Sequence, residues 1–443
     1  MKWSKYNLSH HSEKFGHLLY NSLTNSFAAM DEATHEQVQS FRADPNGYDF
    51  SRQPGLMLQL LMMKAIVDDR EEDALLNVIR MERVSRAFDT RFLELTIAPT
   101  LFCNLDCIYC YEQNRNTTRM SRRVEKGVVT FIKQFTRAQC LTLDWFGGEP
   151  LLRFASICRI TDDIKQLGIP FGANLTTNGY LLTDKVASRL DDLKIGSIQV
   201  TVDGPEEVHD QRRPLISGKG TFATIVRNLD RLVDIWKGEL VIRVNIDRTN
   251  SHRYHEIHGY LRDAVKGDNV TIRPGIVLSA GTQYAECLDR KDHAAFQVRS
   301  FREHGIDDFE FYPRGRAPHC TATLKNAYLI GPEGELYRCW MHLGKKDKVV
   351  GDIFDDAPLN AGRIADLMVG TDPFDDPACR QCFFLPICGG GCPDARLENR
   401  YADKPADLCL EFKDSMPEWL EAYYEIWQKQ EAVGRDGPRH PKG

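Results

Sequence analysis

The chain has 443 residues, a formal net charge of -6, 27% charged residues and 42% hydrophobic residues. This balance is typical of a folded globular protein and excludes a disordered chain. Its longest apolar stretch, residues 56–63, is far shorter than the roughly 20 residues of a membrane span, and the N-terminus lacks the apolar segment of a signal peptide. We therefore expect a cytoplasmic protein that binds neither nucleic acid nor membrane.

The first ninety or so residues contain no cysteine and predict a small winged-helix-like domain over residues 1–91. Residues 16–30 have the pattern of a hairpin around Thr24-Asn25. Apolar residues at helical spacing predict helices over 32–41, over 55–69 with an end near Asp68, and over 71–88.

Strand-like and helix-like segments then alternate. The predicted strands are 92–100, the run from 141 into a Gly-Gly-Glu-Pro turn, 171–179, 197–204, 240–247 and 270–277. A helix is expected over 121–135 with Ser121 as its N-cap. Such alternation predicts a parallel sheet wrapped by helices, of the α/β class. Six strands fit a partial (β/α)6 barrel over 92–311, whose chemistry lies at the carboxyl ends of its strands.

Two motifs follow the first two strands. Cys103, Cys107 and Cys110 share one loop of eight residues, and three thiolates so placed can hold three irons of a cubane cluster. A zinc site completed from elsewhere, or three unrelated thiols, is the alternative. After the second strand, Gly147 and Gly148 allow close approach to the backbone, and Glu149 can accept a hydrogen bond from an ammonium group.

Together, the three-cysteine loop and the Gly-Gly-Glu-Pro turn resemble those of radical S-adenosylmethionine (SAM) enzymes, over residues 92 to about 280. The resemblance implies a 4Fe–4S cluster on the three cysteines, SAM on its open iron, and a 5′-deoxyadenosyl radical that abstracts hydrogen from a substrate. It implies that SAM contacts Tyr109, Gly147, Gly148, Glu149, Thr176, Asn178, Asp203 and Arg243. For the last four of these, an ordinary structural role at a strand end is the alternative.

A second group of seven cysteines lies between residues 320 and 409, and the segment 326–340 within it has the pattern of a hairpin. The spacing resembles the SPASM extension of radical SAM enzymes, here 312–420, which carries two auxiliary 4Fe–4S clusters; a zinc ribbon is the alternative. The resemblance implies one cluster on Cys379, Cys382, Cys388 and Cys409, and another on Cys320, Cys339 and Cys392. The fourth ligand of the latter is Cys287, a residue other than cysteine, or none. Residues 421–443 are expected to form a C-terminal tail.

These features predict a radical SAM oxidoreductase that installs an oxidative crosslink or related modification on a ribosomally synthesised precursor peptide. In such enzymes an N-terminal domain often binds the leader peptide as an added strand, and a structural cap is the alternative for residues 1–91. A flavodoxin or ferredoxin is the expected electron donor. A sulfatase-maturing enzyme, which forms formylglycine, is the alternative function, and a non-enzymatic iron–sulfur carrier is a third.

Overall fold

A computed structural model describes residues 1–49, 51, 53–68, 70–112, 117–277, 284–313, 320–356, 359–402 and 406–432. The chain forms two compact units. The first comprises Met1–Ala87, Phe309–His319 and Val369–Gly443, and the second comprises Phe88–Asp308 and Cys320–Met368. The expected boundary after residue 91 lies close to the first division, whereas the cysteine-rich segment 312–420 is shared between both units.

The core of the second unit is a sheet of six parallel strands that neighbour one another in chain order, as the sequence predicts. They are β6 (Phe92–Ile97), β7 (Cys140–Trp145), β8 (Phe171–Thr177), β9 (Ile195–Thr201), β10 (Glu239–Ile246) and β11 (Val270–Ile276). Alternate residues are buried, for example Leu240, Ile242, Val244 and Ile246 of β10. This period of two gives the sheet one apolar face, which must be covered.

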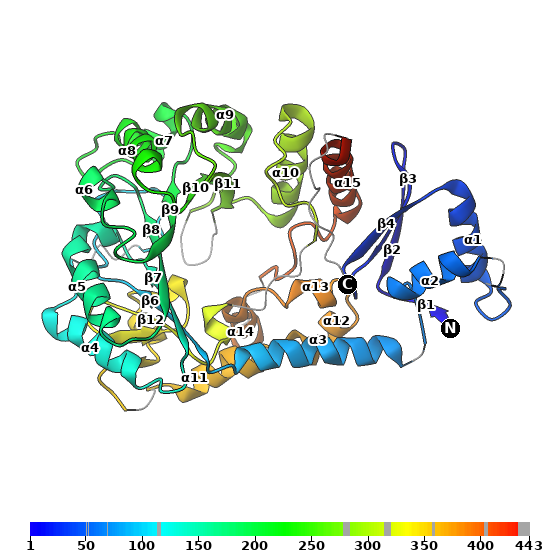
Figure 1. Ribbon diagram of the computed structural model, residues 1–443, viewed down its shortest axis with the longest axis horizontal. Helices are drawn as coiled ribbons and strands as arrows, with labels where there is room; N and C mark the ends of the chain where they lie inside the picture. The colour runs from blue at the N-terminus through cyan, green and yellow to red at the C-terminus, as the bar shows by residue number, and fades with distance from the viewer. Residues whose placement is uncertain are drawn as a thin grey trace. The chain divides into compact units, whose positions relative to one another are not determined.

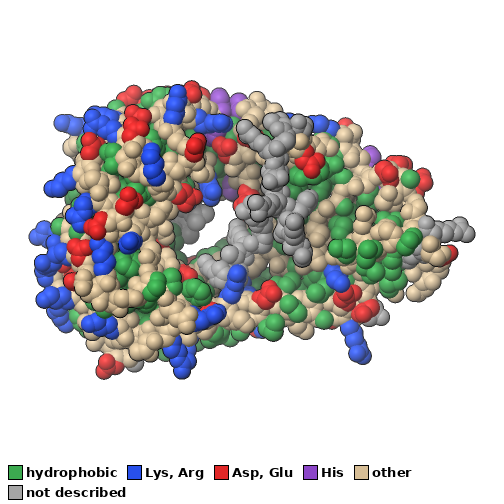
Figure 2. Space-filling view, in the orientation of Figure 1, with side chains coloured by type: hydrophobic (Ala, Val, Ile, Leu, Met, Phe, Trp, Pro, Cys, Tyr) green, Lys and Arg blue, Asp and Glu red, His purple; other side chains and the backbone are tan. Residues whose placement is uncertain are grey.

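Helices of the second unit supply that cover (Figure 1), and the longer ones bury apolar residues at helical spacing. They are α4 (Arg122–Lys133), α5 (Phe154–Lys165), α6 (Asp184–Ala187), α7 (Glu206–Arg212), α8 (Phe222–Ile235), α9 (Tyr254–Ala264) and α10 (Arg290–His304). Helix α4 buries Val124, Val128 and Phe131, and the Ser121 side chain accepts from the Val124 amide as the predicted N-cap. On the face drawn in Figure 2, Lys and Arg side chains of this unit are interspersed with Asp and Glu.

The predicted hairpin within 326–340 is confirmed, and it extends the same sheet. Strand β12 (Ala327–Ile330) pairs with β6 in parallel and with β13 (Glu335–Tyr337) in antiparallel orientation. Strand β14 (Gly351–Asp352) follows at the edge, and helix α11 (Ala361–Ala365) comes after it in the chain. The segment that carries Cys320 and Cys339 therefore lies beside the strand that leads into the first cysteine loop.

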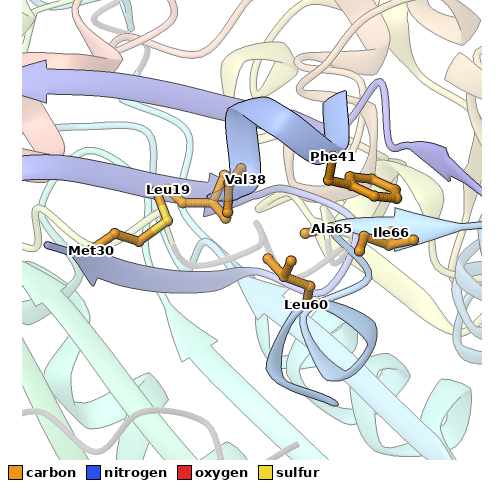
Figure 3. Packing of buried hydrophobic residues seen from close by; sticks show 7 residues of the cluster. All are labelled: Leu19, Met30, Val38, Phe41, Leu60, Ala65 and Ile66. Atoms are coloured by element: carbon orange, nitrogen blue, oxygen red, sulfur yellow. The ribbon is translucent and has the colours of Figure 1, made fainter. Parts of the chain in front are cut away.

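The first unit begins with a three-stranded antiparallel sheet of β2 (Asn7–Ser12), β3 (Gly16–Asn21) and β4 (Ser26–Met30), which confirms the predicted hairpin. Helices α1 (Glu32–Ala43), α2 (Pro54–Met62) and α3 (Glu71–Ala87) follow. One face of the sheet packs on α1 and α2 through a cluster of buried side chains, which Figure 3 shows: Leu19, Met30, Val38, Phe41, Leu60, Ala65 and Ile66.

Two expectations for this unit need correction. The helix expected over 55–69 ends at Met62, because Lys64 has a positive φ of 56° and Ile66–Val67 form strand β5, which pairs with β1 (Lys2–Trp3). The tail expected from residue 421 is helical up to residue 432, within α15 (Met416–Ala432), because Trp419, Tyr423 and Ile426 bury one apolar stripe.

The rest of the first unit consists of α12 (Pro377–Arg380), α13 (Leu385–Cys388) and α14 (Pro393–Tyr401). Aromatic residues of the β2–β4 sheet pack on α15, as in the edge-on contacts of Phe15 with Tyr424 and of Phe27 with Tyr423. In the part of the chain that the structure describes, no helix combines the length and the apolarity that crossing a membrane requires.

Candidate active site

A cavity of about 550 Å³ opens at the carboxyl ends of the parallel strands of the second unit. Carboxyl ends of parallel neighbours meet at one edge of a sheet, so loops far apart in sequence converge there. The cavity brings together most residues that the sequence singled out for the first cluster and for SAM: Cys103, Cys107, Tyr109, Cys110, Gly147, Gly148, Thr176, Asn178 and Arg243. Glu149 and Asp203 do not line it.

The cysteine loop is held by backbone hydrogen bonds to the last residue of α7 and to the segment that follows it. The Asp106 amide donates to the Pro214 carbonyl at 2.8 Å, and the Ile108 amide donates to the Arg212 carbonyl at 3.1 Å. The Leu105 amide donates to Cys103 Sγ at 3.4 Å. The loop therefore has a fixed shape, and its thiols accept hydrogen bonds from the chain itself.

Burial raises the pKa of all three thiols, to about 12 for Cys103 and Cys110. Thiolates form here when a metal supplies positive charge, since metal ligands must be deprotonated. Among the described residues no three His, Cys, Asp or Glu side chains are arranged to hold a metal ion. A cubane cluster binds each thiolate to a different iron, so its ligands do not converge on one ion. Three soft thiols on one loop that opens on a cavity fit that group.

The two glycines after β7 let this turn pack against the start of the cysteine loop. A Cβ on Gly147 would lie 2.4 Å from the Thr100 carbonyl oxygen, and one on Gly148 would lie 2.5 Å from the carbonyl oxygens of Leu101 and Phe102. Gly147 also has a φ of +110°. The sequence suggests that glycine admits a ligand, but the structure shows that it also admits the backbone of the neighbouring loop.

Glu149 joins the ends of two strands. Its fully buried carboxylate accepts hydrogen bonds from the Leu151 amide at 2.9 Å, the Thr177 hydroxyl at 2.8 Å and the Asn178 amide at 2.8 Å. Burial raises its pKa. The Asn178 side chain in turn donates to Asn104 Oδ1 at 2.8 Å and to Cys103 Sγ at 3.7 Å. Glu149 thus orders the residues around the cysteine loop from behind the cavity wall.

Two buried arginines that sequence reasoning missed surround Tyr109. Arg213 lines the cavity and donates from Nη1 to the Tyr109 hydroxyl at 2.7 Å, and Asn245 donates to the same oxygen at 3.0 Å. The Arg212 guanidinium lies 5.0 Å from the centre of the Tyr109 ring. A pair of arginines in a polar stretch normally indicates a solvated surface, so only their buried partners reveal this role.

Asp203 is one of those partners. It accepts from Arg212 Nε at 3.0 Å, and Asp247 accepts from Arg212 Nη1 at 2.6 Å, with all three side chains buried. Arg243 lines the cavity, donates to Asn245 Oδ1 at 2.7 Å, and burial lowers its pKa. Asp203 therefore anchors Arg212, and Arg243 lines the cavity; a contact of either residue with SAM stays a prediction.

The hairpin beside β6 also contributes to the cavity. Trp340 and Met341, which directly follow Cys339, line it, and the Trp340 ring lies 4.5 Å from that of Phe146. Neither residue was singled out from the sequence, because nothing local indicates that β12 pairs with β6. Residues 314–319, just before Cys320, lie outside the described residues.

No disulfide links the remaining cysteines, all of which lie among the described residues. Cys320 and Cys339 belong to the second unit, whereas Cys392 belongs to the first, so this predicted set is divided between them. Cys287 donates to the Tyr284 carbonyl at 3.6 Å, and its role as fourth ligand stays a prediction. Cys379, Cys382, Cys388 and Cys409 all lie in the first unit. Cys140 begins β7 and Cys158 lies in α5.

Residues 97–257 match the radical SAM superfamily. The chain contains a radical SAM domain. The match runs from β6 into α9 and includes the cysteine loop, the glycine turn and the arginine pair. Together with the relatives below, it shows that the protein is an enzyme.

Two curated relatives are similar over most of their length. The chain is 26% identical over 352 residues to mycofactocin maturase MftC of Mycolicibacterium smegmatis, which covers 75% of this chain and 86% of that protein. It is 25% identical over 317 residues to the serine-type anaerobic sulfatase-maturating enzyme of Klebsiella aerogenes. That match covers 66% of this chain and 77% of the Klebsiella enzyme. An uncharacterized protein of Methanocaldococcus jannaschii, 31% identical over 129 residues, is matched over only 43% of its length.

Two solved structures share the fold. Native anSMEcpe with bound AdoMet has a TM-score of 0.58 at 20% identity and covers 75% of this chain and 97% of its own. Streptococcus suis SuiB bound to precursor peptide SuiA has a TM-score of 0.52 at 16% identity and covers 94% of this chain and 99% of its own.

Proposed function

We propose that the protein is a radical SAM maturase that installs an oxidative crosslink, or a related modification, on a ribosomally synthesised precursor peptide. One observation carries the proposal: the cavity lined by the cysteine loop is also lined by Trp340 and Met341, next to the predicted cluster ligand Cys339. A peptide bound in this cavity would lie against both the cysteine loop and the residues that follow Cys339, a predicted ligand of an electron-accepting cluster. The relatives named as maturases support the same function.

When bound, the 4Fe–4S cluster on Cys103, Cys107 and Cys110 supplies the electron that cleaves SAM and so starts hydrogen abstraction from the substrate. The chain's own residues bind and orient. Arg213 places a positive charge beside Cys107, where it can meet the carboxylate of SAM. Tyr109, held by Arg213 and Asn245, would contact the adenine of SAM.

We further propose a partial (β/α)6 barrel followed by a SPASM domain with two auxiliary 4Fe–4S clusters. The fit is supported in the first unit by glycines: a Cβ on Gly391 would lie 2.3 Å from the Leu408 carbonyl oxygen, next to Cys409. This close approach brings the segment after Cys388 against the residue before Cys409. Three clusters of four irons predict about twelve irons per chain.

The N-terminal domain is proposed to bind the leader of the precursor peptide. Strands β2 and β4 are the two edges of its sheet. An edge strand presents unpaired amide and carbonyl groups, to which an extended peptide can add as a further strand. A flavodoxin or ferredoxin is the proposed electron donor. The proposed compartment is the cytoplasm, because its reducing conditions disfavour disulfides between cysteines.

The decisive experiment uses the full chain, reconstituted with iron and sulfide, together with SAM, dithionite and the peptide encoded beside its gene. We expect 5′-deoxyadenosine and a mass change in the peptide, both of which Cys103→Ala/Cys107→Ala/Cys110→Ala abolishes. The triple variant should keep about eight of twelve irons, because the auxiliary ligands remain. Deoxyadenosine without any change in the peptide would contradict the maturase proposal.

The alternative is a sulfatase-maturing enzyme, favoured by the similarity to the Klebsiella enzyme. It predicts that a short peptide with a sulfatase active-site serine or cysteine is converted to formylglycine. Turnover of this peptide, and not of the neighbouring gene's product, would replace the proposal with this function. An iron–sulfur carrier without catalysis predicts no cleavage of SAM at all.

A further inference from the structure

Cys379, Cys382, Cys388 and Cys409 of the first unit form the four-cysteine set. Two cationic side chains donate directly to sulfur atoms of this set. Arg396 Nη2 lies 3.4 Å from Cys379 Sγ, and Lys413 Nζ lies 3.2 Å from Cys409 Sγ. These cysteines are the first and the last of the set in sequence. The two cations therefore reach it from separate segments, α14 and the turn that precedes α15.

Arg396 is fixed in this position. Its Nη1 donates to Asp376 Oδ2 at 2.6 Å, its Nη2 also donates to the Gly390 carbonyl at 2.7 Å, and its side chain is only 11% exposed. Asp376 in turn accepts from the backbone amides of Ala378 and Cys379. Because each partner is itself held, the guanidinium cannot swing away from the sulfur as an exposed cation can.

The same residues bring the set together. Arg396 connects the Cys379 turn to the glycine run after Cys388, and Gly391 packs on Leu408, the residue before Cys409. Gly390 packs on Pro373, because a Cβ on Gly390 would lie 2.7 Å from the proline Cγ. The thiols of Cys379 and Cys382 also interact electrostatically. Four soft ligands gathered beside two cations suit an anionic thiolate cluster.

We propose that Arg396 and Lys413 raise the reduction potential of the auxiliary cluster on Cys379, Cys382, Cys388 and Cys409. This inference rests on the proposed function for the presence of that cluster. A thiolate-ligated cluster gains one negative charge when it accepts an electron. Nearby positive charge and hydrogen bonds to its sulfurs stabilise the reduced form. The pair thus makes this cluster an acceptor for the electron that a peptide radical leaves on forming its new bond.

The test is a potentiometric titration with dithionite, followed by electron paramagnetic resonance, on the reconstituted full chain. The Cys103→Ala/Cys107→Ala/Cys110→Ala background removes the signal of the first cluster. We expect Arg396→Gln and Lys413→Gln each to make reduction about tenfold less favourable, a downward shift of about 59 mV for one electron. The double variant should shift further, and Arg396→Lys, which keeps the charge, should shift less than Arg396→Gln.

Arg400→Gln is the matched control. Arg400 lies on the same helix α14 but donates to the Gly370 carbonyl at 3.1 Å. It should leave the potential unchanged. An unchanged potential in the double variant, at the iron content of the parent, would overturn the inference while the proposed function stands. If Arg396→Gln loses iron, Lys413→Gln decides alone. A parent protein without iron on this set would overturn both.

Discussion

The cysteine loop of the second unit and the four-cysteine set of the first unit treat negative charge differently. In the loop, Cys103 accepts from two neutral donors, the Leu105 amide and the Asn178 side chain. In the set, Cys379 and Cys409 accept from the cations Arg396 and Lys413. Arg213 places its positive charge beside the loop but donates to Tyr109, whereas in the set the two cations donate to the sulfur atoms themselves.

The pKa values of the cysteine thiols reflect the same difference in their contacts with cations. Burial raises the pKa of Cys103 and Cys110 to about 12, and the charge of Arg213 opposes that effect at both thiols. Burial also raises the pKa of Cys379, but Arg396 opposes that effect. Although burial acts against it, hydrogen bonds from Cys379, Ala378 and Arg396 lower the pKa of Asp376. Arg396 therefore acts on its thiol through a hydrogen bond as well as through its charge.

In both regions, the absence of a Cβ on a glycine lets a neighbouring backbone segment pack closely. A substitution at such a glycine beside the cysteine loop has the largest expected effect. Gly148→Ala places a Cβ 2.5 Å from two backbone carbonyl oxygens of the cysteine loop, neither of which can move independently. We expect at least a hundredfold lower rate of deoxyadenosine formation, because about 1 Å of displacement can cost that much. The measurement is uncoupled SAM cleavage, without peptide, at fixed iron content.

Gly172→Ala is the matched control for Gly148→Ala. Gly172 lies on β8 of the same sheet, and a Cβ there meets nothing within 4 Å. This variant should retain SAM cleavage. Equal rates for Gly148→Ala and the parent would show that the turn tolerates a side chain, and that packing against the loop does not set the geometry of the site.

A glycine substitution in the four-cysteine set should have a smaller effect, and it should change iron content and not SAM cleavage. Gly391→Ala forces a Cβ to 2.3 Å from the Leu408 carbonyl at a φ of +74°, so Cys409 must move away from the set. We expect the loss of about four irons per chain, with SAM cleavage without peptide reduced less than twofold. Gly55→Ala in α2, where a Cβ meets nothing within 4 Å, is the control. Loss of SAM cleavage in Gly391→Ala would show that the two sites are not independent.

The sequence predicts the local structure of the second unit well. Six strands, the Ser121 cap and the hairpin within 326–340 follow from periodicity, which depends on near neighbours only. The cysteine loop and the glycine turn follow from spacing. Their convergence on one cavity follows from the rule that parallel strands end at the same edge.

Contacts between distant segments could not be predicted in this way. The pairing of β12 with β6, which brings Trp340 to the cavity, depends on residues more than 200 positions apart. The burial of Arg212 depends on Asp203 and Asp247, and no local pattern distinguishes it from a surface arginine. Lys64 ends α2 early for a similar reason, because β5 gains its partner from the first residues of the chain.

The variant with the smallest expected effect, Glu94→Gln, tests whether a carboxylate on β6, the strand that leads into the cysteine loop, destabilises the fold. Burial, and then Asp144, raise the pKa of Glu94 on β6. A carboxyl group whose pKa is higher in the folded state destabilises that state as pH rises above its unfolded pKa of about 4.3. Glu94→Gln should therefore raise the Tm of the apo protein by about 2 °C at pH 7.5, and the gain should vanish near pH 4.

Asp308→Asn should show the opposite sign. A hydrogen bond from His258, at 2.6 Å, lowers the pKa of Asp308, so this carboxylate stabilises the fold above its unfolded pKa and loses that effect in acid. Calorimetry of both variants across this pH range separates charge from packing. A gain for Glu94→Gln that is equal at both pH values would mean that the side chain's fit in the sheet, and not its charge, is unfavourable. The difference in charge between the two regions would then lie only in the cysteines and in the groups that donate hydrogen bonds to them.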